Sequence, residues 1–285
     1  MEPNGAGRTP FFLMSEHGEA TRLPLRSGCV VLSRLDGGRS SLRALAPSVK
    51  FVLSGEEVYS IDGRTRAVRP GQFLLVEAGS DLEARTPPSD KTVGLCVYLG
   101  ASLAPEADRG ALGRVIEGSA AEPLAALLGR YAALLARQPQ AGEALAARIV
   151  DEVTVAAEDF VSSFCNRLDR LGSLKRSTRI ETLQRVERAR AFIHANMDRP
   201  LSLDEIAAAA ALSRFHLSRS FASVHGLPPL AYHRRLRLDA AARLLKAEAA
   251  SASELAGRLG YGSLSAFTRA FRQAYGVPPS CARGL

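Results

Sequence analysis

Apolar positions in the C-terminal third of the chain recur at helical spacing, and the pattern repeats after about 50 residues. Three short segments each appear twice, at offsets of 49 or 50: SLDEIA at 202–207 and SASELA at 251–256, LSRSF at 217–221 and FTRAF at 267–271, GLPP at 226–229 and GVPP at 276–279. A repeat of this period indicates two copies of one supersecondary unit.

Each copy contains the signals of two short helices joined by a turn. Ser202 and Ser251 each lie three residues before a glutamate, Glu205 or Glu254. This is the capping-box spacing that begins a helix. Ser213 and Ser263 are candidate caps for the second helix, Gly226 and Gly276 suit its left-handed end, and the following prolines stop it. A helix, a tight turn and a second helix predict a helix-turn-helix.

Two longer helices complete a compact all-α domain. One is predicted from Ile180 to Asn196 and the other from Leu230 to Glu248, between the two copies. Both carry apolar residues at steps of three or four. The expected buried positions are Leu183, Val186, Phe192 and Ile193 in the first helix, and Leu236, Ala240, Leu244 and Leu245 in the second. We expect Arg234, Arg235, Arg237 and Arg243 on the outside of the second.

The excess positive charge of the chain lies entirely in this domain. Residues 178–285 hold 16 of the 37 Lys and Arg residues but 8 of the 29 Asp and Glu residues, and residues 1–177 hold 21 of each sign. Fifteen of the 16 are arginines, whose planar fork matches phosphates and guanine edges. A solvated basic surface is the alternative interpretation, and charge alone does not separate the two.

The C-terminal repeat resembles the AraC/XylS family of bacterial transcription regulators. The segment 260–279, GYGSLSAFTRAFRQAYGVPP, is similar to the signature of that family, and the resemblance covers about residues 180–283. It implies two helix-turn-helix units that contact successive major-groove segments of double-stranded DNA. Ala211 departs from the pattern, because the family often has glycine in the first turn. The expected DNA-binding residues are Arg214, Phe215, Ser218 and Arg219 in the first unit, and Leu264, Ser265, Thr268, Arg269 and Arg272 in the second.

The N-terminal half shows short strands separated by turn signals. Asp62-Gly63 is a hairpin signal, and Pro70-Gly71 is a second break. The stretch 59–76 resembles the small cupin-like β-barrel that is common in this family. The expected strands are Cys29–Leu35, Lys50–Leu53, Glu57–Ile61, Arg66–Val68, Gln72–Val76, Leu82–Arg85 and Thr92–Leu99.

Histidine and cysteine usage argues against metal or catalytic chemistry in this barrel. Residues 18–193 contain no histidine, and His17 stands alone before them. The four cysteines are scattered without a CxxC motif, which favours a reducing cytoplasm. We therefore expect no metal, no cofactor and no catalytic residue. A barrel can still hold a small apolar molecule, but no effector-binding residue can be named.

Residues 121–137 and 140–165 are predicted to form two helices. In the second, apolar residues recur at steps of three or four: Leu145, Ile149, Val153, Ala156, Phe160 and Phe164. This stripe forms either a dimer seam or a contact with the barrel of the same chain, and the resemblance slightly favours the dimer. Residues 166–178, with Gly172, several serines and no apolar periodicity, are the expected linker.

The sequence thus predicts an α+β protein of two domains. Residues 1–28 form an N-terminal arm, 29–165 a cupin-like sensor and dimerisation domain, and 179–285 the all-α DNA-binding domain. We expect a cytoplasmic homodimer without signal peptide or membrane span, with RNA polymerase as a further partner and a small effector as ligand. The alternatives are a catalytic barrel and a barrel that serves only as the scaffold for a protein partner.

Overall fold

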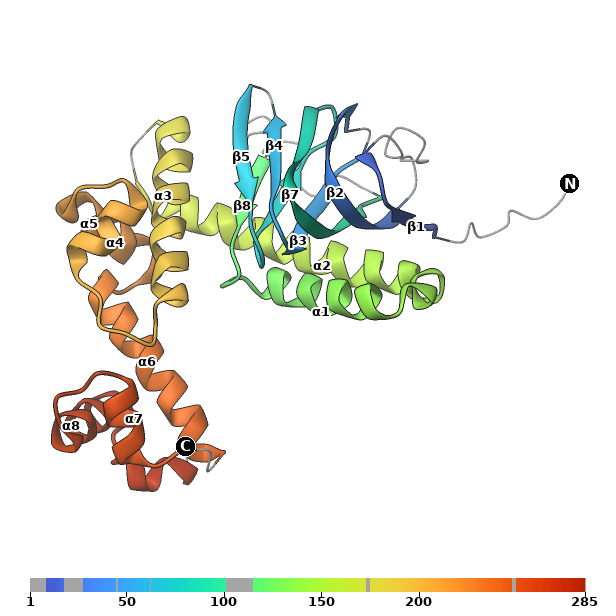
Figure 1. Ribbon diagram of the computed structural model, residues 1–285. Coiled ribbons are helices and arrows are strands. Elements are labelled where there is room, and N and C mark those ends of the chain that lie inside the picture. The colour runs from blue at the N-terminus through green and yellow to red at the C-terminus, as the bar shows by residue number, and fades with distance from the viewer. Residues whose placement is uncertain are drawn as a thin grey trace, which may run out of the picture. The chain divides into compact units, whose positions relative to one another are not determined.

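The computed structural model describes residues 9–17, 28–44, 46–61, 63–100, 115–172, 175–247 and 250–284. The chain divides into two compact units, Met1–Asn166 and Arg167–Leu285. The first contains a curled β-sheet and the second is helical (Figure 1). The protein is therefore a two-domain α+β chain, as the sequence predicts.

The described part of the first unit contains one eight-stranded sheet, in the order β1-β2-β7-β3-β6-β8, with β4 and β5 attached through β7. All pairs are antiparallel except β1 with β2. Figure 1 shows the strands curving into a half-barrel. The strands are β1 (Phe11–Met14), β2 (Cys29–Arg43), β3 (Ser48–Ser54), β4 (Glu57–Ile61), β5 (Arg64–Val68), β6 (Phe73–Val76), β7 (Asp81–Tyr98) and β8 (Val115–Gly118).

Several strands differ from the sequence prediction. β1 lies inside the expected N-terminal arm, where it pairs with the start of β2. The expected strands at 82–85 and 92–99 are two ends of the single strand β7. The sequence suggested a break because prolines 87 and 88 lack the N–H that a ladder needs. In the structure the β2–β7 ladder skips 87–90 opposite Gly37, so the strand continues through a bulge.

Two helices pack on the sheet of the first unit. They are α1 (Pro123–Arg137) and α2 (Gly142–Asp169), joined through the short 3-10 turn η2 (Pro139–Ala141). The Tyr131 hydroxyl of α1 donates to Glu152 of α2 at 2.7 Å. On α2, Phe160 lies edge-on to Phe73 of β6 with ring centroids 5.1 Å apart. Apolar residues at helical spacing therefore dock α2 on its own sheet.

This packing corrects the preference for a dimer seam. Ile149 and Val153 are 0% exposed, and Phe160 and Phe164 are 5% and 2% exposed, within one chain. Side chains that are already buried within their own chain cannot form the contact surface for a second copy. The second of the two alternatives, a stripe packed on the barrel, is the one that the structure contains.

The linker is shorter than the sequence suggested. Helix α2 continues to Asp169, and α3 (Arg176–Ala195) begins before the expected linker ends. The boundary between the two units falls between Asn166 and Arg167, inside the last turns of α2. Gly172, with a positive φ of 73°, lies in the remaining non-helical stretch.

The second unit consists of α3 and five further helices in its described residues. They are α4 (Leu203–Ala210), α5 (Arg214–His225), α6 (Pro229–Lys246), α7 (Ala252–Arg258) and α8 (Leu264–Tyr275), followed by the 3-10 turn η3 (Pro279–Gly284). Helices α4 and α5 pack with α3, and α7 and α8 pack with each other, while α6 contacts both groups. None of the described helices in either unit has the length and apolar character needed to span a membrane.

Helix α6 is buried over more of its circumference than predicted. Beside Ala240, it buries Leu238, Ala241 and Ala242, and it also buries Arg237, which is 9% exposed. Leu244 and Leu245 are only partly buried against the second core. The single apolar stripe predicted from the sequence understates how much of the α6 surface is buried, because α6 contacts both helix pairs. The expectation that Arg237 lies on the outside was wrong.

Candidate nucleic-acid interface

The two helix pairs, α4 with α5 and α7 with α8, begin with the same capping box. Ser202 Oγ accepts from the Glu205 N–H at 3.2 Å, and Glu205 Oε2 accepts from the Ser202 N–H at 2.8 Å. Ser251 and Glu254 make the same two bonds at the same distances. These bonds satisfy N–H groups that a helix start leaves unpaired. The sequence prediction of both helix starts is confirmed.

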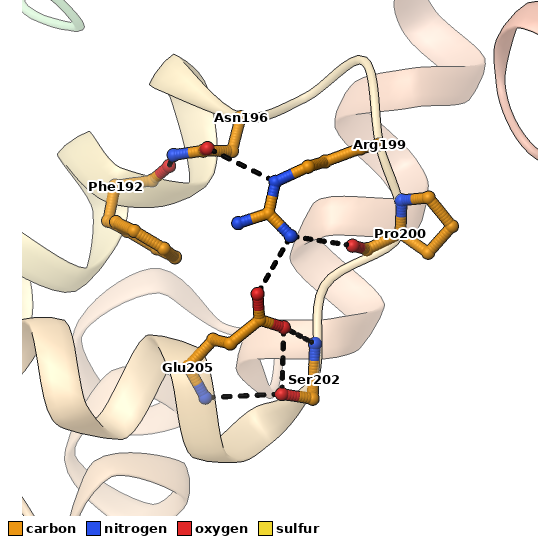
Figure 2. A network of polar contacts seen from close by, with 6 residues as sticks. All are labelled: Phe192, Asn196, Arg199, Pro200, Ser202 and Glu205. Atoms are coloured by element: carbon orange, nitrogen blue, oxygen red, sulfur yellow. Dashed lines mark hydrogen bonds and ion pairs between the residues drawn. The ribbon is translucent and has the colours of Figure 1, made fainter.

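The first capping box is reinforced by an arginine from the preceding loop (Figure 2). Arg199 Nη1 donates to Glu205 Oε1 at 2.7 Å and to the Pro200 carbonyl at 3.2 Å. Hydrogen bonds from the Ser202 backbone and from Arg199 lower the pKa of Glu205 to about 2. The carboxylate therefore holds the end of the loop after α3 on the start of α4.

The second helix of each pair also has matching ends. Ser213 Oγ accepts from the His216 N–H at 3.3 Å, and Ser263 Oγ accepts from the Ala266 N–H at 3.1 Å. The helices end at Gly226 and Gly276, with φ of 78° and 77°. Since both helices span 12 residues between equivalent caps, α5 and α8 present equivalent positions on their surfaces.

The turn inside each pair has the same geometry despite the different residue. Ala211 adopts a left-handed φ of 52°, and Gly260 at the matching position has φ of 62°. The following amides close matching bonds, from Leu212 to the Ala207 carbonyl at 3.0 Å and from Tyr261 to the Ala256 carbonyl at 2.9 Å. Alanine in the first turn thus leaves the turn in place, at the cost of a backbone conformation that glycine adopts more easily.

One face of each of the helices α5 and α8 packs into the hydrophobic core, and the other face is exposed. Leu217, Phe221, Phe267 and Phe271 are 0% exposed. On the opposite side Phe215 is 76% and Leu264 46% exposed. Of the other residues that we expected to contact DNA, Arg214, Arg219, Ser265, Arg269 and Arg272 are exposed, and Ser218 and Thr268 are half-buried. All nine therefore lie on or beside the outer faces.

The arginines of this surface differ in whether they have an ion-pair partner. Arg214 lies 3.3 Å from Asp204 of the preceding helix, and both side chains are largely exposed. Among the described residues, no carboxylate lies within ion-pair distance of Arg219 or Arg269. Two unpaired guanidinium groups at equivalent positions can donate to phosphates or to base edges. Ser220, next to Arg219 in the chain, is buried and takes no part in this surface.

A second candidate site lies in the sheet of the first unit, where the sequence named no residue. A cavity is bordered by β1, β2, β3, β4 and β7 and contains His17, Lys50, Glu57, Tyr59 and Cys96 among otherwise mostly apolar walls. Lys50 is 5% exposed, and its Nζ donates to Cys96 Sγ at 3.3 Å. The Tyr59 hydroxyl donates to Glu57 Oε2 at 2.5 Å, and burial raises the pKa of Glu57.

His17 reaches this cavity from outside the expected barrel. Its Nε2 lies 2.9 Å from Thr86 Oγ1, its Nδ1 lies 3.2 Å from Ser40 Oγ, and burial lowers its pKa. The described residues contain no group of three or more His, Cys, Asp or Glu side chains that could hold a metal ion. The strand pattern carried a signal for part of this site, because alternation puts Glu57 on the same buried face as Tyr59 and Ile61. No sequence signal connected His17 to it.

Comparison with known proteins assigns the helical unit to a class. Residues 206–284 match the family model of a helix-turn-helix domain. The transcriptional regulator GbdR of Pseudomonas aeruginosa is 36% identical over 89 residues, which are 31% of this chain and 24% of that protein. The transcriptional regulator Rob of Salmonella typhimurium is 36% identical over 92 residues, 32% of each chain.

A solved AraC-type regulator from Chromobacterium violaceum is similar at 30% identity, covering 35% of this chain and 90% of that one, with a TM-score of 0.34. The matched part of the chain spans about a quarter to a third of the length of the curated relatives GbdR and Rob. The matched region is a helix-turn-helix domain. Through this C-terminal region, the chain is similar to AraC-type transcription regulators.

Proposed function

We propose that the protein is a sequence-specific transcription regulator that binds double-stranded DNA through two helix-turn-helix units. The observation that carries the proposal is the matched pair of outer faces on α5 and α8, each with an unpaired arginine, Arg219 or Arg269. Each helix starts with serine-capped amides and exposes a large apolar side chain near that start, suited to contact with thymine methyl groups. We assign no catalytic role to the chain.

The two units would occupy successive major-groove segments. Helix α6 packs against both helix pairs, so it sets the spacing between α5 and α8. Two major-groove segments on one side of B-DNA are about 34 Å apart. Arg214, Phe215, Ser218 and Arg219 would contact the first segment, and Leu264, Ser265, Thr268, Arg269 and Arg272 the second.

The test is selection of bound duplexes from a random library by the full chain, followed by affinity measurements across salt concentrations. We expect an enriched sequence with two conserved blocks about one helical turn apart. Affinity for it should fall with salt at roughly −0.9 in log K per log salt for each phosphate neutralised. Absence of an enriched sequence, or an affinity that does not change with salt, would contradict the proposal. Arg64→Ala removes one positive charge from an exposed position on β5 of the first unit. As a control, it should change neither the enriched sequence nor the dependence of affinity on salt.

The first unit, a cupin-like half-barrel in this proposal, would sense a small effector in the cavity around Lys50 and Glu57. Support comes from buried polar groups among apolar walls, the composition typical of ligand sites. Native mass spectrometry of the full chain, before and after denaturation, checks for a retained small molecule. A chain that carries none and binds DNA only with a second protein would favour the partner-controlled alternative.

Homodimerisation and contact with RNA polymerase are further parts of the proposal. The stripe through Ile149 and Val153 is not available for pairing, but Val155 on the same helix is 60% exposed. Sedimentation of the full chain measures the oligomeric state directly. A monomer at concentrations that saturate DNA would remove the dimer from the proposal and leave the DNA-binding part unchanged.

A further inference from the structure

The cavity of the first unit is lined by side chains from one face of the sheet. Strand pairing places Val31 of β2 and Lys50 of β3 on either side of Cys96 of β7. Directly paired residues project to the same face of a sheet, and residues two apart on a strand share that face. This face carries Val31, Ser33, Leu35, Lys50, Cys96 and Tyr98, all of which border the cavity. Lys50 therefore points to the cavity side of the sheet.

The charged end of Lys50 lies among the walls of the cavity. Its Nζ donates to Cys96 Sγ at 3.3 Å, and it lies 5.1 Å from the ring centroid of Tyr98 and 5.8 Å from that of Tyr59. All three partners border the cavity. Since every contact that positions Nζ is made with a cavity wall, the ammonium group itself, and not only its stem, faces the cavity.

The described residues supply little negative charge to this ammonium. It has three donors, and its one hydrogen-bond acceptor among the described residues is a sulfur, which accepts weakly. None of the described carboxylates lies within ion-pair distance of Lys50 Nζ. Glu57 borders the same cavity, but it accepts from the Tyr59 hydroxyl, and burial raises its pKa, which favours the uncharged form. A buried cation without a charged acceptor is costly, so the cavity favours an anion.

The size and the walls of the cavity limit that anion to a small one with an apolar part. Away from the polar groups, the walls are formed by Val31, Leu35, Leu82 and Ala84, whose side chains make no hydrogen bonds. The cavity has a volume of about 40 Å³. One water needs about 10–15 Å³ of such space, so the cavity admits roughly three waters or a carboxylate of about two to four carbons.

We propose that the effector of the first unit is a short-chain aliphatic carboxylate, an inference that rests on the sensor role proposed above. Its carboxylate group would accept from Lys50 Nζ, between the rings of Tyr59 and Tyr98. Its hydrocarbon end would lie against Leu35 and Leu82. Inorganic phosphate fits less well, because the apolar walls leave its further oxygens without donors. A long fatty chain exceeds the volume of the cavity.

The experiment titrates sodium propanoate into the full chain without DNA and follows the heat of binding. We expect saturable binding at millimolar concentrations. Propanamide, the uncharged analogue of the same shape, should bind at least about tenfold weaker, because hydrogen bonds between charged groups are roughly twice as strong as neutral ones. Lys50→Met replaces the ammonium with an uncharged side chain and should weaken propanoate by a similar factor. Lys91→Met, at an exposed position on β7, removes the same charge and should leave the affinity unchanged.

A measurement on the unaltered protein locates the site even if Lys50→Met fails to fold. Nuclear Overhauser effects should connect the propanoate methyl group to the methyl groups of Val31, Leu35 or Leu82. Decanoate should leave these effects in place, and their loss on adding decanoate would overturn the short-chain assignment. Effects only to residues of the second unit, such as Leu244, would overturn the proposal. So would a folded Lys50→Met protein with undiminished affinity, displacement of propanoate by inorganic phosphate, or a titration that never saturates.

The carboxylate assignment and the proposed function can fail separately. A different small molecule retained in native mass spectrometry would remove the carboxylate and keep the sensor role. Selection of DNA duplexes in the absence of propanoate tests the DNA-binding part by itself.

Discussion

Ala211 and Gly260 hold the same left-handed backbone conformation at the matching turns of the two helix pairs, with φ of 52° and 62°. Ala211 is the one non-glycine residue with positive φ in the described part of the chain. Its side chain is exposed, so no packing offsets the strain. A left-handed conformation costs an L-residue about 1–2 kcal/mol, and glycine in its place costs about 0.5–1 kcal/mol in unfolded-state entropy.

Ala211→Gly should therefore raise the free energy of unfolding of the helical unit by about 0.5–1 kcal/mol. The measurement is urea unfolding of the full chain followed through helical signal, with an unchanged m-value. Gly260→Ala is the matched reverse change and should lower stability by at least about 1–2 kcal/mol. Its new Cβ would lie 3.1 Å from Pro200 Cγ as well as at positive φ. If both changes shifted the free energy of unfolding in the same direction, the two turns would not be equivalent.

Ile149→Lys should destabilise the first unit by at least about 3 kcal/mol, because it buries an ammonium in the apolar core and removes packed methyl groups. Ile149 is 0% exposed. Thermal unfolding and near-ultraviolet circular dichroism measure the loss. Val155→Lys, at a position 60% exposed, is the control and should keep the fold. A folded Ile149→Lys chain that changed only from dimer to monomer would restore the dimer-seam hypothesis.

Arg269→Ala should cost about 1–3 kcal/mol of affinity on the selected DNA site and relax preference at one or two base positions. Arg219→Ala should act on the other half of the site, about 34 Å away. Both arginines lie two residues before a buried phenylalanine, so they point away from the core. The measurement is affinity against a set of single-base variants of the site.

The same data distinguish base contact from phosphate contact. An arginine that binds only phosphate would, when removed, weaken all sequences equally and reduce the salt slope by about one unit. If both substitutions altered the same base positions, two-groove binding would be wrong. If neither altered binding, α5 and α8 would not be the recognition helices.

Acid should weaken the loop–helix contact at Glu205. Its pKa is lowered to about 2 in the folded chain, so its contribution to stability is present above the unfolded value of about 4.5 and is lost as the pH falls from there toward 2. Glu205→Gln should flatten the decline of stability over that window, as followed by urea unfolding at successive pH values. Glu254→Gln should flatten it less, because the pKa of Glu254 is lowered mainly by Ser251 bonds, and the arginine near it, Arg258, contributes its charge but no hydrogen bond. An unaltered pH profile in Glu205→Gln would contradict the assigned hydrogen bonds.

Local signals account for the part of this protein that the sequence determined by itself. The caps at Ser202, Ser213, Ser251 and Ser263 depend on residues three positions away in the chain, so spacing alone predicts the helix starts. The same helical geometry predicts that Phe221 and Phe271 face the core. Arg219 and Arg269, two residues earlier, then face away from it. The repeat then supplies the second copy of each feature.

Contacts between distant segments decided the rest. Which surface covers the stripe of Ile149 depends on where the sheet lies, and periodicity says only that something covers it. Arg237 is buried because helix pairs pack on both sides of α6, and His17 enters the cavity because β1 pairs with β2. A cation or an imidazole in a polar stretch of sequence is expected at the surface, since burial of charge is costly. Only tertiary packing reveals where the chain departs from that expectation.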